Sequence, residues 1–157
     1  MPITEAGFKL ALSHFASGVT VVTTEHDGRL FGMTVASFAS LSLHPPLVLV
    51  CIESSVKTHD AIGASATFGV SILGADQADI SNRFASRSDD KFAGVDVVRG
   101  ELGVPLIGGA LTTIECRLRE RLDGGDHSIF IGEVVDTQTR EGEPLLYFRS
   151  GYHGLAS

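Results

Sequence analysis

The chain has 157 residues, of which 43% are apolar and 20% charged, so we expect one globular domain over residues 1–157 and exclude a disordered protein. Its formal net charge is −7 and no basic run occurs, which argues against a nucleic-acid groove because such a groove needs clustered Lys and Arg.

Residues 4–17 form the first predicted element, a helix whose apolar residues fall on one stripe: Phe8, Leu12 and Phe15. We expect Thr4 to cap its start and Gly18 to end it. Residues 19–24 are mostly β-branched and predict a strand, which the turn residues 26–28 then end.

Residues 32–52 contain two strand-like segments, 33–38 and 47–52, joined by a connection that carries the hydroxyls of Ser37, Ser40 and Ser42. Hydroxyls and backbone N–H groups beside an apolar strand suit a ligand that is part flat ring and part anion. A flavin fits that description. We expect the strands 19–24, 33–38 and 47–52 to form an antiparallel meander.

The middle of the chain predicts two short helices around one strand. A helix is expected from the polar residues after 53 to about residue 64, and a half-buried strand over 68–73. Asp76 is expected to cap the next helix, whose inner face is Ile80 and Phe84. Residues 86–109 show weak periodicity, which indicates a lid or a poorly ordered loop.

The last third again predicts strands. Residues 114–119 alternate between apolar and charged side chains, so Glu115 is expected to face outward. A tight hairpin over 123–126 leads to a strand over 129–135, and residues 145–148 form a last strand. About seven strands with few long crossovers predict a mainly β, mostly antiparallel barrel.

Several common motifs are missing from the chain. It has neither the glycine fingerprint of dinucleotide folds nor a P-loop or nucleophile elbow, and its six histidines lack ligand spacing, so no metal is expected. Cys51 and Cys116 lie in predicted strands and are expected to be buried, reduced and inert. With no signal peptide and no apolar run near the ~20 residues of a membrane span, we expect a cytoplasmic protein without a membrane partner.

Residues 53–58 are the best candidate for a phosphate site. They follow a strand, carry the hydroxyls of Ser54, Ser55 and Thr58, and lead into a helix whose first N–H groups attract anions. The alternative is that Ser54 or Ser55 merely caps that helix. The hydroxyl groups of Thr34, Ser37 and Ser40 allow two similar interpretations. They either form part of a flavin site or lie on the solvent-exposed face of a strand.

Three further places are ambiguous. His127 lies in a tight turn and is either solvated or oriented by Asp126 toward a ligand. Arg83 and Phe84 end a helix, where we expect a core phenylalanine and an exposed or flavin-edge arginine. Residues 148–153 form either a docking strand or a platform on which an adenine stacks.

Together these stretches resemble the short-chain flavin reductases, the reductase components of two-component monooxygenases, which have the FMN-binding split-barrel fold. The matching stretches cover nearly the whole chain in order: FASGVTVVTT (15–24), GMTVASFASLSL (32–43), PPLVLV (45–50), GDHSIFIGEV (125–134) and PLLYF (144–148).

The resemblance implies a homodimer of antiparallel split β-barrels with short flanking helices, which binds FMN or FAD and takes NADH or NADPH as co-substrate. The flavin-binding residues that it implies are Met33, Thr34, Val35, Ala36, Ser37, Ser40, Cys51, Ile52, Glu53, Ser54, Ser55, Thr58, Arg83 and Phe84. Those implied on the pyridine-nucleotide side are His127, Phe148, Ser150, Gly151 and Tyr152. Family members often carry Asn or Ser at the position of Ala36, so here only a backbone contact is available.

Hydride transfer from a nicotinamide to a flavin needs two stacked rings rather than a strong acid or base, so no acid–base residue is assigned. We therefore predict an NAD(P)H:flavin oxidoreductase, NADH being favoured because no arginine pair for a 2′-phosphate is evident, that supplies reduced flavin to a separate oxygenase. The alternatives are a flavin- or haem-binding barrel without turnover and a reductase of metal–corrin or ferric substrates on the same fold.

Overall fold

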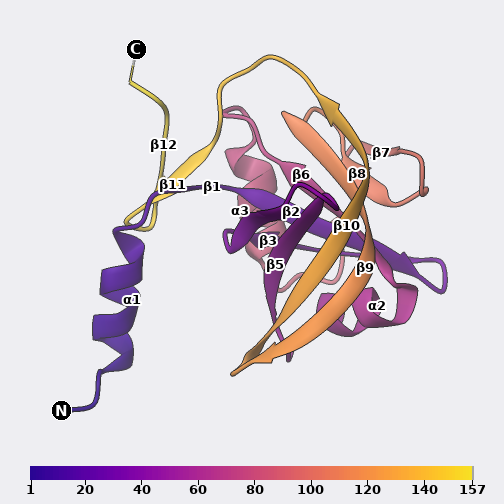
Figure 1. The fold of residues 1–157 in the computed structure, drawn as a ribbon. Helices are drawn as coiled ribbons and strands as arrows, with labels where there is room; N and C mark the ends of the chain where they lie inside the picture. Colours follow the sequence, from indigo (N-terminus) through magenta and orange to yellow (C-terminus); the bar gives the residue numbers. More distant parts are fainter. Residues whose placement is uncertain (157) are drawn as a thin grey trace.

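The computed structural model describes residues 1–156 and has three helices and twelve strands in that range (Figure 1). The helices are α1 (Glu5–Ser13), α2 (Lys57–Ser65) and α3 (Ala78–Ala85). The strands are β1 (Ser17–Gly18), β2 (Thr20–His26), β3 (Arg29–Val35), β4 (Phe38–Ser42), β5 (Leu47–Glu53), β6 (Thr67–Ile72), β7 (Val97–Arg99), β8 (Pro105–Ile107), β9 (Thr112–Gly124), β10 (His127–Thr139), β11 (Leu146–Phe148) and β12 (Gly151–His153). Within residues 1–156, no helix is long and apolar enough to cross a membrane.

Seven strands form one antiparallel sheet in the order β3-β2-β6-β9-β10-β5-β4, which confirms the predicted mainly β, antiparallel fold. The predicted meander is wrong beyond its first hairpin. β2 and β3 pair across the turn at Asp27 and Gly28, but β3 and β4 lie at opposite edges of the sheet and β5 pairs with β4 and β10. The chain leaves the sheet at the β3 edge and returns to it at the β4 edge. This strand order depends on contacts between residues far apart in the sequence.

Apolar side chains from facing strands fill the interior of the curled sheet. Val22, Val50, Phe68 and Phe130 are fully buried there. Gly132 is required by this packing, because a Cβ at that position would lie 2.6 Å from Cζ of Phe68. Protein interiors are close-packed, so a larger residue at position 132 would displace the ring.

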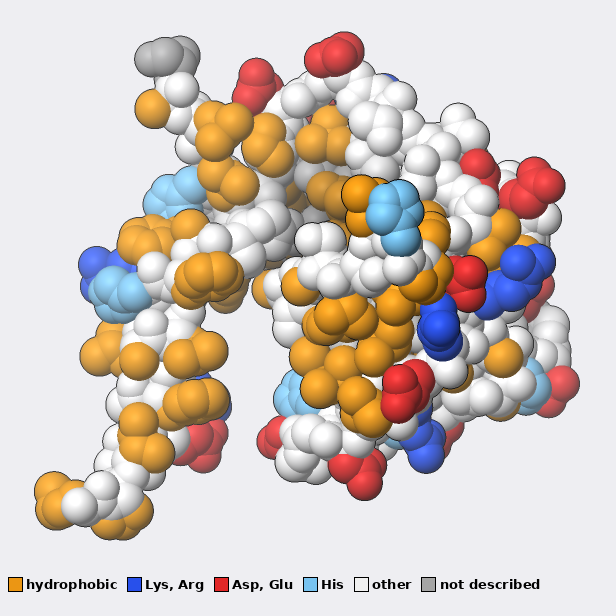
Figure 2. All heavy atoms as spheres, viewed as in Figure 1, with side chains coloured by type: hydrophobic (Ala, Val, Ile, Leu, Met, Phe, Trp, Pro, Cys, Tyr) orange, Lys and Arg blue, Asp and Glu red, His pale blue; other side chains and the backbone are white. Residues whose placement is uncertain are grey.

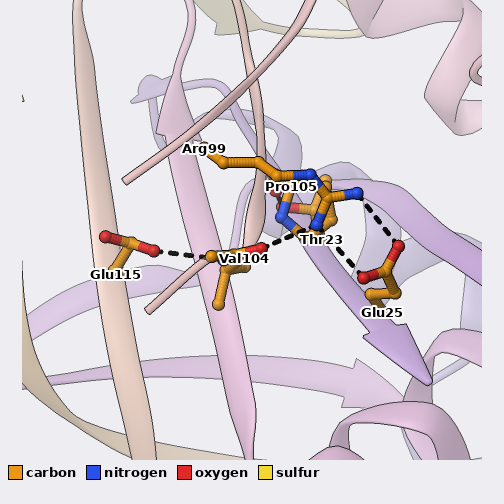
Figure 3. Close-up of polar contacts among 7 residues, drawn as sticks. Thr23, Glu25, Arg99, Val104, Pro105 and Glu115 are labelled. Carbon is orange, nitrogen blue, oxygen red and sulfur yellow. Dashed lines mark hydrogen bonds and ion pairs between the residues drawn. The ribbon is translucent and has the colours of Figure 1, made fainter. Parts of the chain in front are cut away.

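The β7–β8 hairpin lies in the stretch that was predicted to be a lid or a poorly ordered loop (Figure 1). Its strand β8 packs against β2 and β6, and the loop between β7 and β8 contacts Glu115 on β9. Glu115, which was expected to face outward, is therefore only 1% exposed. One oxygen of its carboxylate accepts hydrogen bonds from the backbone N–H groups of Leu102 and Val104, at 3.1 and 3.2 Å. Arg99 donates to both oxygens of Glu25 on β2, at 2.9 and 3.1 Å (Figure 3). Thr23 on β2 also donates to the Pro105 carbonyl, and the N–H of Ile107 donates to the Ser71 hydroxyl on β6 at 3.0 Å. The expected lid is thus an ordered hairpin held by several hydrogen bonds.

Helix α1 and the small sheet β1-β11-β12 stand apart from the barrel (Figure 1). Thr4 caps the helix as predicted, because its Oγ1 accepts a hydrogen bond from the N–H of Gly7 at 3.0 Å. The helix ends at Ser13 and not at Gly18, since Ser17 and Gly18 pair with β11. The apolar stripe does not face the core: Phe8, Leu12 and Phe15 are 53%, 58% and 80% exposed.

Helix α3 starts without the predicted cap. Its N-cap is Gln77 and not Asp76, and the Gln77 side chain instead accepts a hydrogen bond from the N–H of Gly74 at 2.9 Å. The predicted inner face is confirmed, because Phe84 is fully buried and Ile80 packs beside it.

Both cysteines are free thiols; Cys116 is buried, whereas Cys51 is only half-buried. Burial, together with the charge of Glu115, raises the pKa of the Cys116 thiol from 9.0 to about 12. The unfolded chain therefore loses this proton at a lower pH than the folded chain does. We expect the free energy of unfolding to fall as pH rises from 9 toward 12, by up to about 1.4 kcal/mol per pH unit from this group. In urea titrations at several pH values, Cys116→Ala should lose this component of the slope, whereas Cys51→Ala should keep it.

Candidate active site

A cavity of about 640 Å³ opens between β3, the start of α2 and the loop after α3. Six of the predicted flavin residues line it: Met33, Thr34, Glu53, Ser55, Thr58 and Phe84. A second cavity, of about 430 Å³, lies between the β7–β8 hairpin and the ends of β9 and β10, and holds none of the predicted residues. The first cavity is therefore the candidate site.

The wall on β3 is built by residues 29–34, which all line the cavity. A Cβ on Gly32 would lie 3.0 Å from the Phe84 ring and 3.1 Å from the Phe92 ring, so this glycine lets the strand approach both rings. The Thr34 hydroxyl donates to the backbone carbonyl of Ser81 on α3, at 2.6 Å. It is therefore used in part to hold α3 against the wall.

The start of α2 forms the next wall. Its N-cap is Val56, with no side-chain hydrogen bond, so the alternative that Ser54 or Ser55 caps the helix is wrong. The backbone N–H groups of Lys57 and Thr58 have no protein acceptor within residues 1–156. Unpaired N–H groups at a helix start attract anions. Both residues that carry them here, Lys57 and Thr58, line the cavity together with Ser55.

The third wall is the loop after α3, whose cavity-facing residues were not predicted from sequence. Lys91 donates to the carbonyls of Gly32 and Phe84, at 3.1 and 3.2 Å, and its burial lowers the pKa of its ammonium group. Arg83 was expected at the flavin edge. Its guanidinium instead donates to the backbone carbonyls of the loop, those of Lys91 at 2.5 Å, Ala93 at 2.6 Å and Asp90 at 3.1 Å.

Other lining residues that were not predicted from the sequence include Arg29, Phe31, Arg87 and Phe92. Each is an ordinary surface or core residue in its own segment, and only the approach of β3 to the loop brings them together. Phe92 lies edge-on to Phe84 at 4.9 Å between ring centroids.

Seven other predicted flavin residues lie outside the cavity lining: Val35, Ala36, Ser37, Ser40, Cys51, Ile52 and Ser54. The side chains of Val35 and Ile52 are buried in the barrel core, which leaves only their backbone for a ligand. Ser37 donates its hydroxyl to the Cys51 carbonyl at 2.9 Å, which ties the end of β3 to β5. Ser40 is exposed on the edge strand β4.

His127 begins β10 and pairs with Glu53, a lining residue of the cavity, at the end of β5. Its Nδ1 lies 2.8 Å from a carboxylate oxygen of Asp126, as predicted, and this contact lowers the pKa of Asp126. The Asp126 carbonyl also accepts a hydrogen bond from the N–H of Ser54 at 2.9 Å. The hairpin therefore holds the imidazole beside the candidate phosphate segment.

The predicted C-terminal residues belong to the small sheet. Arg149 and Ser150 form a left-handed turn between β11 and β12, and the Phe148 ring lies 6.0 Å from the ring of His14, the C-cap of α1. Tyr152 connects this sheet to the cavity, because its hydroxyl lies 2.7 Å from the Ser81 hydroxyl and donates to Asn82 at 2.9 Å. Ser81 also accepts from Thr34 through its carbonyl. Gly151 follows the turn as the first residue of β12 and pairs with Phe148.

Known proteins share both the sequence and this architecture. The profile of the flavin reductase like domain matches residues 12–156. The reductase component of a 4-nitrophenol 4-monooxygenase/4-nitrocatechol 2-monooxygenase from Rhodococcus opacus is 43% identical over 151 residues, which are 96% of this chain and 81% of that protein. FMN reductase (NADH) SmoA from Agrobacterium fabrum is 43% identical over 140 residues, or 89% of this chain and 80% of that protein.

A solved structure of similar form is NADH:FAD oxidoreductase SgcE6 from Streptomyces globisporus C-1027, in complex with NAD and FAD fragments. It has a TM-score of 0.92 and 37% identity, and the match covers 99% of this chain and 98% of that one. These matches confirm the family that the sequence motifs predicted. The chain belongs to the flavin reductase like domain family.

Proposed function

We propose that this chain transfers a hydride from NADH to a flavin, FMN or FAD, and releases the reduced flavin to a separate oxygenase. The observation that carries the proposal is the cavity itself, where the β3 wall, the uncapped start of α2 and Glu53 meet. His127 is outside the cavity lining but pairs with Glu53 in the sheet. The relatives named as NADH-dependent reductases and as a monooxygenase component support the same reaction and partner.

The residues present fit a flavin. The flat apolar part would lie along Met33 and Thr34, and the phosphate would accept hydrogen bonds from the free N–H groups at Lys57 and Thr58. When bound, the flavin supplies the hydride acceptor, and the chain's task is to hold the two rings together and exclude water. His127 would hold the nicotinamide side, oriented by Asp126.

NADH oxidation followed at saturating flavin tests this function. We expect turnover with NADH and free flavin, exceeding that with NADPH, and one NADH consumed per flavin reduced under anaerobic conditions. No turnover with riboflavin, FMN or FAD would refute the proposal and favour the binding barrel without turnover. Faster turnover with metal–corrin or ferric acceptors in the absence of flavin would favour the other alternative.

His127→Ala should raise the KM for NADH about tenfold and leave the KM for flavin within twofold. The expected effect is that of one lost hydrogen bond to a bound ligand, about 1.4 kcal/mol. Asp126→Asn keeps the turn and should raise the NADH KM by a smaller factor. An unchanged NADH KM in both variants would remove His127 from the nicotinamide site.

We propose a homodimer in which α1 packs on a second copy of the chain. The helix exposes apolar side chains along its length, including Leu10 at 60% (Figure 2). Leu43, which follows the edge strand β4, is 75% exposed. An unpartnered apolar helix and an exposed leucine after a free sheet edge both favour cover by a partner, because large exposed apolar patches are rare on monomers. Phe8→Asp combined with Leu12→Asp should give a monomer in sedimentation experiments, whereas Lys9→Ala should remain dimeric. A wild-type chain that sediments as a monomer at micromolar concentration would contradict the dimer.

We also propose that the protein acts in the cytoplasm. Its two cysteines are free thiols, which suits a reducing compartment, and its proposed co-substrate NADH is a cytoplasmic metabolite.

A further inference from the structure

We infer that the flavin this site binds best is FAD rather than FMN. The inference rests on the proposed function and concerns the part of the cavity beyond the start of α2. Relatives of similar identity carry names that specify either flavin, so membership of the family leaves this choice open.

The first argument is the charge of the cavity. Four of the chain's 12 Lys and Arg line it, but only two of its 19 Asp and Glu, although the chain as a whole carries −7. The four cations are Arg29, Lys57, Arg87 and Lys91, and the two carboxylates are Glu53 and Asp89. A cationic cavity on an acidic protein concentrates positive potential where a polyanionic ligand binds.

The second argument is that two of these cations are uncommitted. Lys91 is occupied by two backbone carbonyls, and Lys57 lies 3.4 Å from Asp89. Arg29 and Arg87 have no carboxylate within ion-pair distance in residues 1–156. Free guanidinium groups bind phosphate oxygens in a bidentate manner, so the cavity offers more phosphate donors than the helix start alone.

The third argument is the length of the cavity. It follows β3 from Thr34 to Arg29, a distance of about 17 Å at the usual rise per residue of a strand. If the flavin ring lies at Thr34 and the first phosphate at the start of α2, no part of FMN would reach the end of the cavity that Arg29 lines. FAD adds a second phosphate and an adenosine that extend toward that end.

The far end also presents a surface for the adenine. Phe31 is half-buried and lines the cavity, and the Arg29 guanidinium carbon lies 5.4 Å from the centroid of the Phe31 ring. An aromatic ring and a guanidinium plane are the groups on which a base stacks. Arg29 and Phe31 would therefore hold the adenine, and Arg87 the second phosphate.

Flavin fluorescence titrations of the whole protein test this inference without relying on turnover. We expect the Kd for FAD to be at least tenfold lower than that for FMN, and the Kd for FMN to be lower than that for riboflavin. Arg29→Ala combined with Arg87→Ala should raise the Kd for FAD about tenfold or more and leave that for FMN within twofold. Arg119→Ala, at an exposed position of β9 outside the cavity lining, is the matched control and should change neither Kd.

Three results would overturn the inference. The wild-type chain could bind FMN and FAD with equal Kd, or the double variant could raise both Kd values equally. The third is a double variant in which only the KM for NADH rises. The last result would assign the arginines to the pyrophosphate of the nicotinamide nucleotide. These outcomes differ from failure of the proposed function, in which no flavin is reduced by NADH whatever its affinity. Raising the salt concentration should reduce the preference for FAD, because the discriminating contacts are charged and open to solvent.

Discussion

Ser55→Asp is expected to raise the KM for flavin about a hundredfold, with little change in the NADH KM. Ser55 lines the cavity just before the unpaired N–H groups of α2, where we place the flavin phosphate. A carboxylate about 5 Å from a phosphate charge costs about 3 kcal/mol at an effective dielectric constant of about 20. Steady-state kinetics at variable flavin and saturating NADH measure the effect.

Ser54→Asp is the matched control for this prediction. Ser54 is equally exposed and adjacent in sequence, but it does not line the cavity, and its N–H is bonded to Asp126. The same charge added there should change the flavin KM by less than tenfold. Equal effects of the two variants would mean that the phosphate is not held at the cavity wall.

Glu115→Ala is expected to lower the free energy of unfolding by about 3 kcal/mol or more. It leaves the backbone N–H groups of Leu102 and Val104 without their acceptor, and an unsatisfied buried donor costs about 1–3 kcal/mol. Urea denaturation measures the loss, and hydrogen exchange at residues 102 and 104 should show that it is located in the β7–β8 hairpin.

Glu115→Gln separates the hydrogen bonds from the charge. Both bonds end on one carboxylate oxygen, and the other oxygen is buried without a partner within residues 1–156. The glutamine amide keeps the accepting oxygen and removes a buried charge. The free energy of unfolding of this variant should therefore be within about 1 kcal/mol of the wild-type value. A loss as large as that of Glu115→Ala would show that the negative charge is essential. Glu120→Ala, exposed on the same strand, is the control and should change stability by less than about 0.5 kcal/mol.

The local elements were predictable because their causes are local. The β-branched run of β2, the turn at Asp27 and Gly28, the Thr4 cap and the hairpin before His127 each depend on neighbouring residues. The phosphate segment was found for the same reason, since a strand, hydroxyls and a helix start follow one another within residues 53–58. The family motifs, each short but together in order, identified the fold class as well.

The sequence by itself thus determined most strands of the main sheet, the family and one wall of the site. Only the tertiary structure decided the strand order, the burial of Glu115, and the meeting of Arg29 with Arg87 in one cavity. Alternation along β9 predicts an exposed Glu115, but the hairpin that covers it comes from elsewhere in the chain. Strand pairing and side-chain burial depend on contacts between segments that are distant in the sequence. The hydrophobic periodicity and turn motifs of one segment do not specify which other segment will pack against it.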